Sequence, residues 1–446
     1  MIKRIHLLFL IFLLLPAGIL MAQGNKINFV EYDLPNGLHV ILHQNSSVPV
    51  VAVTILYHVG SKNESSDRTG FAHFFEHLMF EGSDNIPRGE FDKYVQSAGG
   101  VNNANTTQDR TFYYELFPSN QLELGLWLES ERLLHLRIDS TGVETQRKVV
   151  KEERSLRYDN QPYGSIIEET FKHAFKVHPY QWTPIGSAQY IDQAKLTEFM
   201  DFHAKFYVPD NATLSIAGDI NISETKKLVE KYFAGIPKGK SKIQRPTIKE
   251  PAQTAEVRDI VLDNIQLPAV IQAYHMPANG TPDSYALQML TTLLSNGESS
   301  RLIKSIVDQQ QKALYVGSFP FALEDAGLFI VFGIANMGVT AEDLDKAIDT
   351  EIEKVKNELV SDHDLQKLKN QSESEFVSQN STMAGIAENL SNYHVYFGDA
   401  NLVNTEIDRY MKVTKEDIKR VAQQYLKKEN RVVLYYLPKQ EKTEGK

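Results

Sequence analysis

Two histidines and a glutamate stand within an otherwise aromatic and aliphatic stretch, residues 70–80. On a helix, His73 and His77 lie one turn apart, about 6 Å along the axis, so both imidazoles point into the same space with Glu76 beside them. Two neutral imidazoles in this arrangement suit zinc. The order His-x-x-Glu-His inverts a common zinc-binding motif, and in it the glutamate acts as general base rather than as ligand.

The alternative is that these are core side chains bonded to backbone groups. Burying three polar side chains without a metal requires a separate partner for each group, and every unmet group costs about 1–3 kcal/mol. The joint spacing of His73, Glu76 and His77 therefore favours metal binding. Other histidines, among them His135 and His275, lack paired spacing and are predicted to be packing or surface residues.

Composition narrows the class of protein. The chain has 446 residues, of which 42% are apolar and 23% charged, as expected of a globular protein with more than one domain. Its formal net charge of −10 argues against nucleic acid as the main partner and leaves a peptide or protein substrate open. Because the chain has no cysteine, a zinc site must be built from histidine and carboxylate ligands.

The N-terminus has the pattern of a secretory signal peptide. Lys3 and Arg4 precede an apolar run from Leu7 to Leu15, and small residues follow it up to Ala22. We expect a signal peptide over residues 1–22, an exported mature chain without a membrane span, and the periplasm of a Gram-negative bacterium as its location. The alternative of an uncleaved anchor is disfavoured because the apolar run is short for a membrane span.

The order of predicted elements indicates two similar halves of an α+β protein. Each half is expected to be an antiparallel-rich sheet with helices packed on it, since strands and helices cluster rather than alternate. The predicted units are a metal-binding domain over residues 25–235, a breaker-rich linker over 236–252, and a homologous domain over 253–440. The second half has no His or Glu from Tyr285 to Leu294, where the motif should repeat, so one zinc ion is expected per chain.

Several motifs in this order resemble the pitrilysin/insulinase family, and most of all its short bacterial members, which are similar to mitochondrial processing peptidase subunits. The likeness covers nearly the whole mature chain. It rests on these segments: His73–His77, Asn103–Thr106, Val149–Glu153, His178–Tyr180, Ile185–Gly186, Phe206–Ala212 and Gly218–Asp219.

The resemblance implies a zinc endopeptidase that hydrolyses peptides or unfolded segments, with Glu76 activating the zinc-bound water. It also implies a third ligand from a later glutamate. Glu152 and Glu153 both qualify by chemistry, and Glu153 is favoured because it lies 76 residues after His77, the spacing associated with the short members. Three protein ligands leave a fourth position free for water, as in catalytic zinc sites.

Substrate binding is implied at Asn103 and Ala104, where a peptide would add as a strand to a sheet edge. The sequence departs from the family at Gln146, seven residues before Glu153, where a glutamate outside the ligand shell is usual. Glu144 is the proposed substitute.

The second departure concerns the far side of the cleft. The family usually places an Arg seven residues before a Tyr that reaches the substrate; here Tyr315 is present but Asp308 occupies the Arg position. An ionised Asp cannot stabilise an oxyanion. Either Tyr315 acts with another cation such as Lys312, or a homologous subunit supplies Arg and Tyr, which favours a heterodimer. A non-catalytic scaffold subunit and a self-sufficient homodimeric peptidase are the alternatives.

Overall fold

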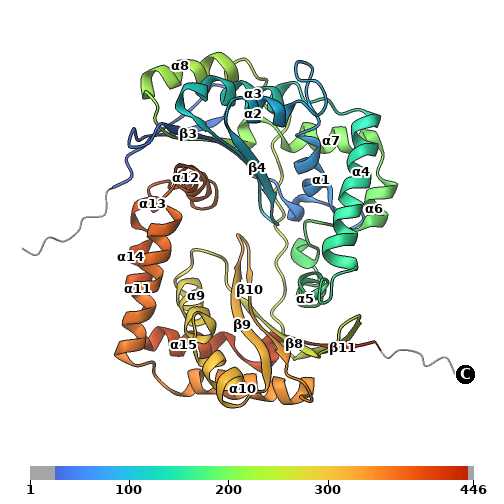
Figure 1. The fold of residues 1–446 in the computed structure, drawn as a ribbon, viewed down its shortest axis with the longest axis vertical. Coiled ribbons are helices and arrows are strands. Elements are labelled where there is room, and N and C mark those ends of the chain that lie inside the picture. The colour runs from blue at the N-terminus through green and yellow to red at the C-terminus, as the bar shows by residue number, and fades with distance from the viewer. Residues whose placement is uncertain (1–25, 440–446) are drawn as a thin grey trace, which may run out of the picture.

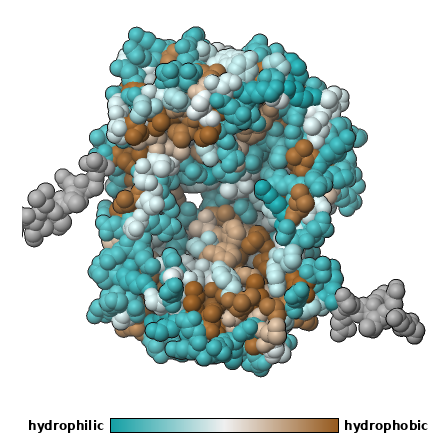
Figure 2. Space-filling view, viewed as in Figure 1, coloured by the Kyte–Doolittle hydropathy of each residue, from teal (hydrophilic) through white to brown (hydrophobic). Residues whose placement is uncertain are grey.

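The computed structural model describes residues 26–439, so the predicted signal peptide lies outside the described residues. The chain forms two halves that face each other across a hollow, as the ribbon and the space-filling view both show (Figures 1 and 2). Each half holds one sheet, with six strands in the first and five in the second. The predicted α+β class with two alike halves is confirmed.

The first sheet has one parallel pair, between β2 and β6, and its other neighbours are antiparallel. The turn between its first two strands contains Gly37 at φ 90°, as expected for hairpin chemistry. Across the sheet the order is β1 (Val30–Asp33), β2 (His39–Gln44), β6 (Ala212–Gly218), β3 (Val50–Tyr57), β5 (Thr111–Pro118) and β4 (Val101–Thr106).

The second sheet repeats this topology. Its order is β7 (Val257–Asp263), β11 (Arg431–Pro438), β8 (Ala269–Met276), β10 (Gly327–Ala335) and β9 (Ala313–Ala322). The parallel pair β7 and β11 occupies the place of β2 and β6, and β9 takes the place of the edge strand β4. The order β2-β6-β3-β5-β4 therefore recurs as β7-β11-β8-β10-β9, which agrees with a diverged duplication.

Helices surround both sheets (Figure 1). Those of the first half are α1 (Phe71–Leu78), α2 (Phe91–Ser97), α3 (Leu122–Leu134), α4 (Ser140–Arg154), α5 (Ile166–Ala174), α6 (Ala188–Gln193), α7 (Leu196–Phe206) and α8 (Ile222–Phe233). Those of the second half are α9 (Pro282–Ser295), α10 (Ala341–Asn357), α11 (Asp362–Gln379), α12 (Met383–Phe397), α13 (Leu402–Thr405), α14 (Ile407–Met411) and α15 (Lys415–Tyr425). Of these, α12 lies between the halves, on the inner side of the first sheet (Figure 1).

The halves exchange helices. From the first half, Phe171 of α5 and Phe175 just after it are buried in one apolar cluster with Ile271 and Leu328 of the second sheet. From the second half, α12 packs on the first sheet, where Ile386 and Leu390 join a cluster with Ile41, Ala52 and Ala217. The two halves are therefore packed against each other through α5 and α12. The predicted domain limits at residues 235 and 253 stay predictions.

Candidate metal centre

The start of α1 is fixed by a buried carboxylate. Gly70 precedes the helix at φ 99°, and Glu64 accepts the N–H groups of Gly70 at 2.9 Å and Ala72 at 2.8 Å. These are N–H groups that a helix N-terminus leaves without intrahelical partners. Burial raises the pKa of Glu64 to about 8, against the lowering effect of these backbone donors. The interaction holds the first turn of α1 in one place.

A second glycine allows a close approach to the same turn. Gly186 has φ +63°, and a Cβ placed on it would lie 2.3 Å from both N and Cα of Gly70. A side chain here would displace the N-terminus of α1, because no pair of non-bonded heavy atoms tolerates that separation. This contact gives a physical reason for glycine in the Ile185–Gly186 motif.

Packing between phenylalanine rings and a hydrogen bond from a buried arginine also hold α1 in place. Phe71 and Phe74 pack on Phe199 of α7 with ring centroids 4.7 and 4.5 Å apart. Fully buried Arg132 donates from Nε to the carbonyl of Met79 at 3.4 Å, just after the helix. With one face buried, the helix turns His73, Glu76 and His77 toward α4 and β4.

Three of the predicted residues converge. Nε2 of His77 lies 3.1 Å and Nε2 of His73 lies 3.5 Å from Oε2 of Glu153, on α4. The two imidazole rings are nearly perpendicular, at 83°, with centroids 4.9 Å apart. Glu152 is exposed and takes no part in the group.

The protonation states of these side chains suit a metal ion. Burial, together with His77, lowers the pKa of His73 to about 4, so this ring is neutral near pH 7. A hydrogen bond with His77 lowers the pKa of Glu153 against the effect of burial. Arg157 binds the other oxygen, Oε1 of Glu153, at 2.8 Å and so leaves Oε2 facing the histidines.

The donor set fits zinc. Ligands about 2.0–2.1 Å from a tetrahedral zinc ion lie roughly 3.3 Å from one another, which matches the two separations measured to Oε2 of Glu153. Two imidazoles and one carboxylate also form a donor set found in catalytic zinc sites.

Glu76 lies on the same face of α1 and is oriented by the edge strand. Thr106, at the end of β4, donates its hydroxyl to Oε2 of Glu76 at 2.7 Å. Burial raises the pKa of Glu76, whereas this hydrogen bond lowers it. The carboxyl is thus directed by a hydrogen bond and placed in a partly desolvated position, as a general base requires.

Asn103 and Ala104 lie on β4, at the edge of the first sheet. Within the described residues, β4 pairs with β5 alone, with Asn103 opposite Tyr114 and Ala104 opposite Tyr113. The N–H of Ala104 donates to the side-chain oxygen of its neighbour Asn103 at 2.9 Å. A free strand edge therefore runs toward Thr106, which contacts Glu76.

Gln146 lies two turns before Glu153 on α4. Its side-chain amide donates to Glu81, which also pairs with Arg88 at 2.6 Å. Glu144 is 61% exposed and pairs with Arg147, so it does not take the place of the missing carboxylate. The carboxylate beside Gln146 comes instead from Glu81, just past the end of α1.

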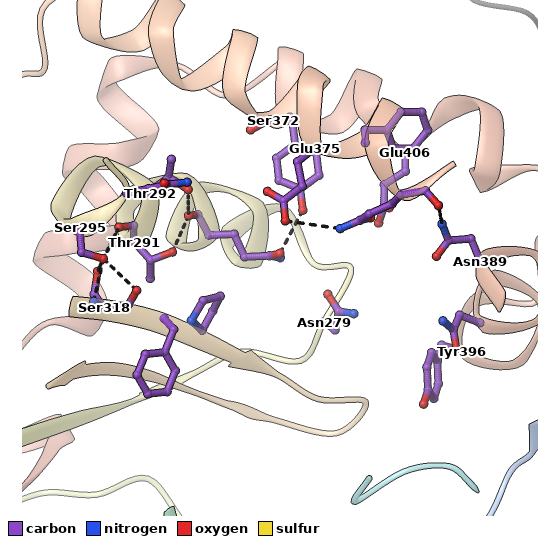
Figure 3. Close-up of a pocket in the computed structure, with 18 of the residues that line it drawn as sticks. Asn279, Thr291, Thr292, Ser295, Ser318, Ser372, Glu375, Asn389, Tyr396 and Glu406 are labelled. Atoms are coloured by element: carbon purple, nitrogen blue, oxygen red, sulfur yellow. Dashed lines mark hydrogen bonds between the residues drawn. The ribbon is translucent and has the colours of Figure 1, made fainter. Parts of the chain in front are cut away.

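Tyr315 lies on β9, away from the metal cluster. It is 53% exposed and lines a cavity of about 620 Å³ in the second half. Asn279, Ser318 and Glu406 line the same cavity (Figure 3). Asp308, in the Arg position, is exposed. The chain does not bring Tyr315 into the group formed by His73, His77 and Glu153.

The residues that orient the predicted site residues were not predicted from the sequence. Glu64, Glu81 and Arg157 carried no motif of their own, and only proximity in the fold reveals them. Thr106 stood inside the Asn103–Thr106 motif, and its position two residues after Ala104 on the same face of a strand was an available signal.

The comparisons with known proteins agree with this fold. Residues 39–183 match the insulinase family, peptidase family M16, and residues 193–372 match the domain described as its inactive domain. The chain therefore belongs to peptidase family M16.

Among its relatives is the zinc protease PqqE of Helicobacter pylori, 33% identical over 420 residues that make up 94% of each chain. A probable mitochondrial-processing peptidase subunit beta of Arabidopsis thaliana is 25% identical over 403 residues, which are 88% of this chain and 75% of that one.

Solved structures support the same family. The crystal structure of a protease from Helicobacter pylori matches with a TM-score of 0.89 at 31% identity, over 93% of this chain and 100% of that one. The periplasmic protease PqqL from Escherichia coli shares the fold, with a TM-score of 0.75 at 19% identity; the match covers 93% of this chain and 48% of that one. Among residues 26–439, no helix combines the length and apolar composition needed to cross a membrane.

Proposed function

We propose that the chain is a zinc-dependent endopeptidase acting on peptides or unfolded protein segments. The observation that carries the proposal is the convergence of Nε2 of His73 and His77 on Oε2 of Glu153, with Glu76 directed by the edge strand β4. Relatives described as zinc proteases support the choice of metal. One ion is proposed at this centre.

Each residue of the centre has its own role. Zinc, when bound, supplies Lewis acidity and lowers the pKa of its water. His73, His77 and Glu153 hold the ion in position. Glu76 accepts a proton from the attacking water and passes it to the leaving amine, and Thr106 keeps its carboxyl directed. The free edge of β4 at Asn103 and Ala104 aligns the substrate backbone, which predicts a loose sequence preference.

Replacement of the base tests the proposal. In Glu76→Gln, turnover of a quenched fluorescent peptide should fall by roughly 100-fold or more, because general-base catalysis supplies about that factor. Zinc content should stay unchanged, since Glu76 is not a ligand. Retained turnover would contradict the assigned base. Loss of zinc would move Glu76 into the ligand set.

The proposal that a homologous subunit is needed rests on two residues of the second half. Asp308 is exposed, and Tyr315 lines a cavity apart from the metal centre, so a homologous subunit bringing Arg and Tyr would complete the cleft. The relation to a mitochondrial-processing peptidase subunit supports a two-subunit arrangement.

Assay of the purified chain separates the alternatives. The heterodimer predicts low turnover that rises by at least about tenfold on adding the homologous subunit. High zinc-dependent turnover of the chain alone would favour a homodimer. A chain that binds zinc but stays inactive with its partner would favour the scaffold role.

Export is proposed from the pattern of residues 1–22, and the periplasmic relative PqqL is consistent with it. The test is N-terminal sequencing of protein from the periplasmic fraction. We expect the mature chain to begin at Gln23. Recovery from the cytoplasm with residues 1–22 intact would contradict the proposal.

A further inference from the structure

A second group of histidines and carboxylates joins the two halves, apart from the peptidase centre. Glu31 lies on β1 and His39 on β2, at the edge of the first sheet, while His394 comes from α12 of the second half. The imidazole rings of His39 and His394 stack with centroids 3.4 Å apart and planes 6° apart. Sequence spacing gave no signal of this group, because the elements meet only through the packing of α12 on the first sheet.

Its distances resemble those of the peptidase centre. Glu31, His39 and His394 each offer one ligand atom, and the three atoms lie within 4.8 Å of one another, as do those of His73, His77 and Glu153. Nε2 of His39 lies 3.3 Å from Oε2 of Glu31. That separation equals the roughly 3.3 Å expected between two ligands of a tetrahedral zinc ion.

A carboxylate outside the group orients His39. Nδ1 of His39 lies 2.7 Å from Oδ1 of Asp33. When Nδ1 donates to Asp33, the lone pair of Nε2 points at the carboxylate of Glu31. Two lone pairs facing each other are repulsive unless His39 carries a second proton or a cation lies between them. A carboxylate that accepts from the far nitrogen of a ligating histidine is the usual support of a zinc ligand.

His394 supplies the third donor. A neutral imidazole carries N–H on one ring nitrogen and a lone pair on the other, so this ring offers one ligand atom. Imidazole lone pairs lie in the plane of the ring, so those of two parallel, stacked rings do not converge on one point. Binding one ion therefore requires the His394 ring to turn about its Cβ–Cγ bond, out of the parallel stack.

We propose that Glu31, His39 and His394 bind a second divalent transition-metal ion of the zinc class, which ties the first hairpin to α12. His39 is 13% exposed and Glu31 is 44% exposed, so the site is open to solvent and can complete its coordination with water. Because α12 belongs to the second half and packs on the first sheet, the ion would link the two halves. The site is structural and takes no part in peptide hydrolysis.

The test uses the full chain with the peptidase centre removed by His77→Gln and Glu153→Gln. Titration with Co²⁺, followed by visible absorption, should show one equivalent bound. Adding His394→Phe, which keeps an aromatic ring against His39 but removes both nitrogens, should weaken that binding by at least about tenfold. His363→Phe, at a side chain that is 90% exposed, is the matched control and should bind like the parent.

Thermal unfolding gives a second readout. Zn²⁺ should raise the unfolding temperature of the double variant and of the His363→Phe control, but not of the His394→Phe variant. Absence of Co²⁺ binding in the double variant, or equal binding after His394→Phe, would overturn the proposal. His39 would then serve only as a hydrogen-bonding residue between Asp33 and Glu31. Since the peptidase centre is absent throughout, neither result bears on the proposed peptidase activity.

Discussion

At the scale of single residues, the choice between two adjacent glutamates decides the metal centre. Oε2 of Glu153 faces the two histidines, and its other oxygen is held by Arg157, whereas Glu152 is exposed. Adjacent residues on a helix point about 100° apart, so the carboxylates of the pair cannot exchange roles without turning α4.

Substitution of each glutamate in turn separates them. Glu153→Gln should lower zinc affinity by about 100-fold or more, since even residues outside the ligand shell of zinc sites cost 10–100-fold. Glu152→Gln is the matched control and should keep both zinc and turnover. The measurement is zinc content after dialysis against a graded series of a zinc buffer. If the control lost zinc and Glu153→Gln kept it, the assigned third ligand would be Glu152.

At the scale of elements, α1 is held in place by a contact between two glycines. Gly186 leaves no room for a Cβ beside Gly70, whose N–H is bonded to Glu64. A small shift of this first turn would move His73 relative to His77 and Glu153. The proposed function thus depends on a residue outside the proposed ligand set and the proposed substrate-binding strand.

Gly186→Ala should therefore reduce zinc affinity by at least about tenfold and destabilise the fold by roughly 1–3 kcal/mol, through overpacking against the Gly70 backbone. Gly398→Ala is matched, because Gly398 has φ +66° and a Cβ placed on it would have no neighbour within 4 Å. Gly398→Ala should lose only the stability that a non-glycine residue costs at a positive φ, and its zinc affinity should be unchanged. Equal zinc loss in both variants would show that backbone strain, and not the clash, is responsible.

At the scale of the whole molecule, a buried charge cluster joins the halves near the C-terminal end of α12, where the rings of His58 and Tyr396 lie 6.0 Å apart. Nζ of Lys62, which is 2% exposed, lies 3.0 Å from Asp109, 2.6 Å from Glu324 and 3.0 Å from Asp325. Glu324 also pairs with His58 at 2.8 Å. Buried charges need such partners, so separation of the halves here would leave charges unpaired.

This cluster predicts a loss of stability in acid. Burial raises the pKa of Asp325, but His178 and Lys62 together have a larger effect in the opposite direction. The pKa of Asp325 therefore falls from 3.8 to about 2. A carboxyl whose pKa is depressed on folding stabilises the folded state above its unfolded pKa, and that contribution disappears as pH falls from 3.8 toward about 2. Asp325→Asn should be less stable than the parent at pH 6 and should lose less stability between pH 4 and 2.

The measurement is the urea midpoint of metal-free protein at several pH values, because zinc release in acid would otherwise add to the effect. Asp67→Asn, at a side chain that is 73% exposed, is the control and should follow the parent. A pH profile of Asp325→Asn identical to that of the parent would contradict the role given to this carboxylate.

Local patterns predicted much of the first half. The helix carrying His73, Glu76 and His77 was predicted from spacing alone, since residues four apart on a helix share one face. The structure adds a π-helical turn over Ser155–Asp159, which follows α4 just after Glu153. Hydrophobic periodicity could not reveal that turn, because the chain stays helical through it.

The sequence by itself determined the α+β class, the duplicated order of elements and the face of α1 that carries His73, Glu76 and His77, because these depend on residues close together in the chain. Only the tertiary structure decided that Oε2 of Glu153 points at the histidines, that Gly186 sets the start of α1, and that His39 meets His394. Those contacts join segments far apart in sequence, and their geometry depends on how helices pack across two sheets, which no local spacing encodes.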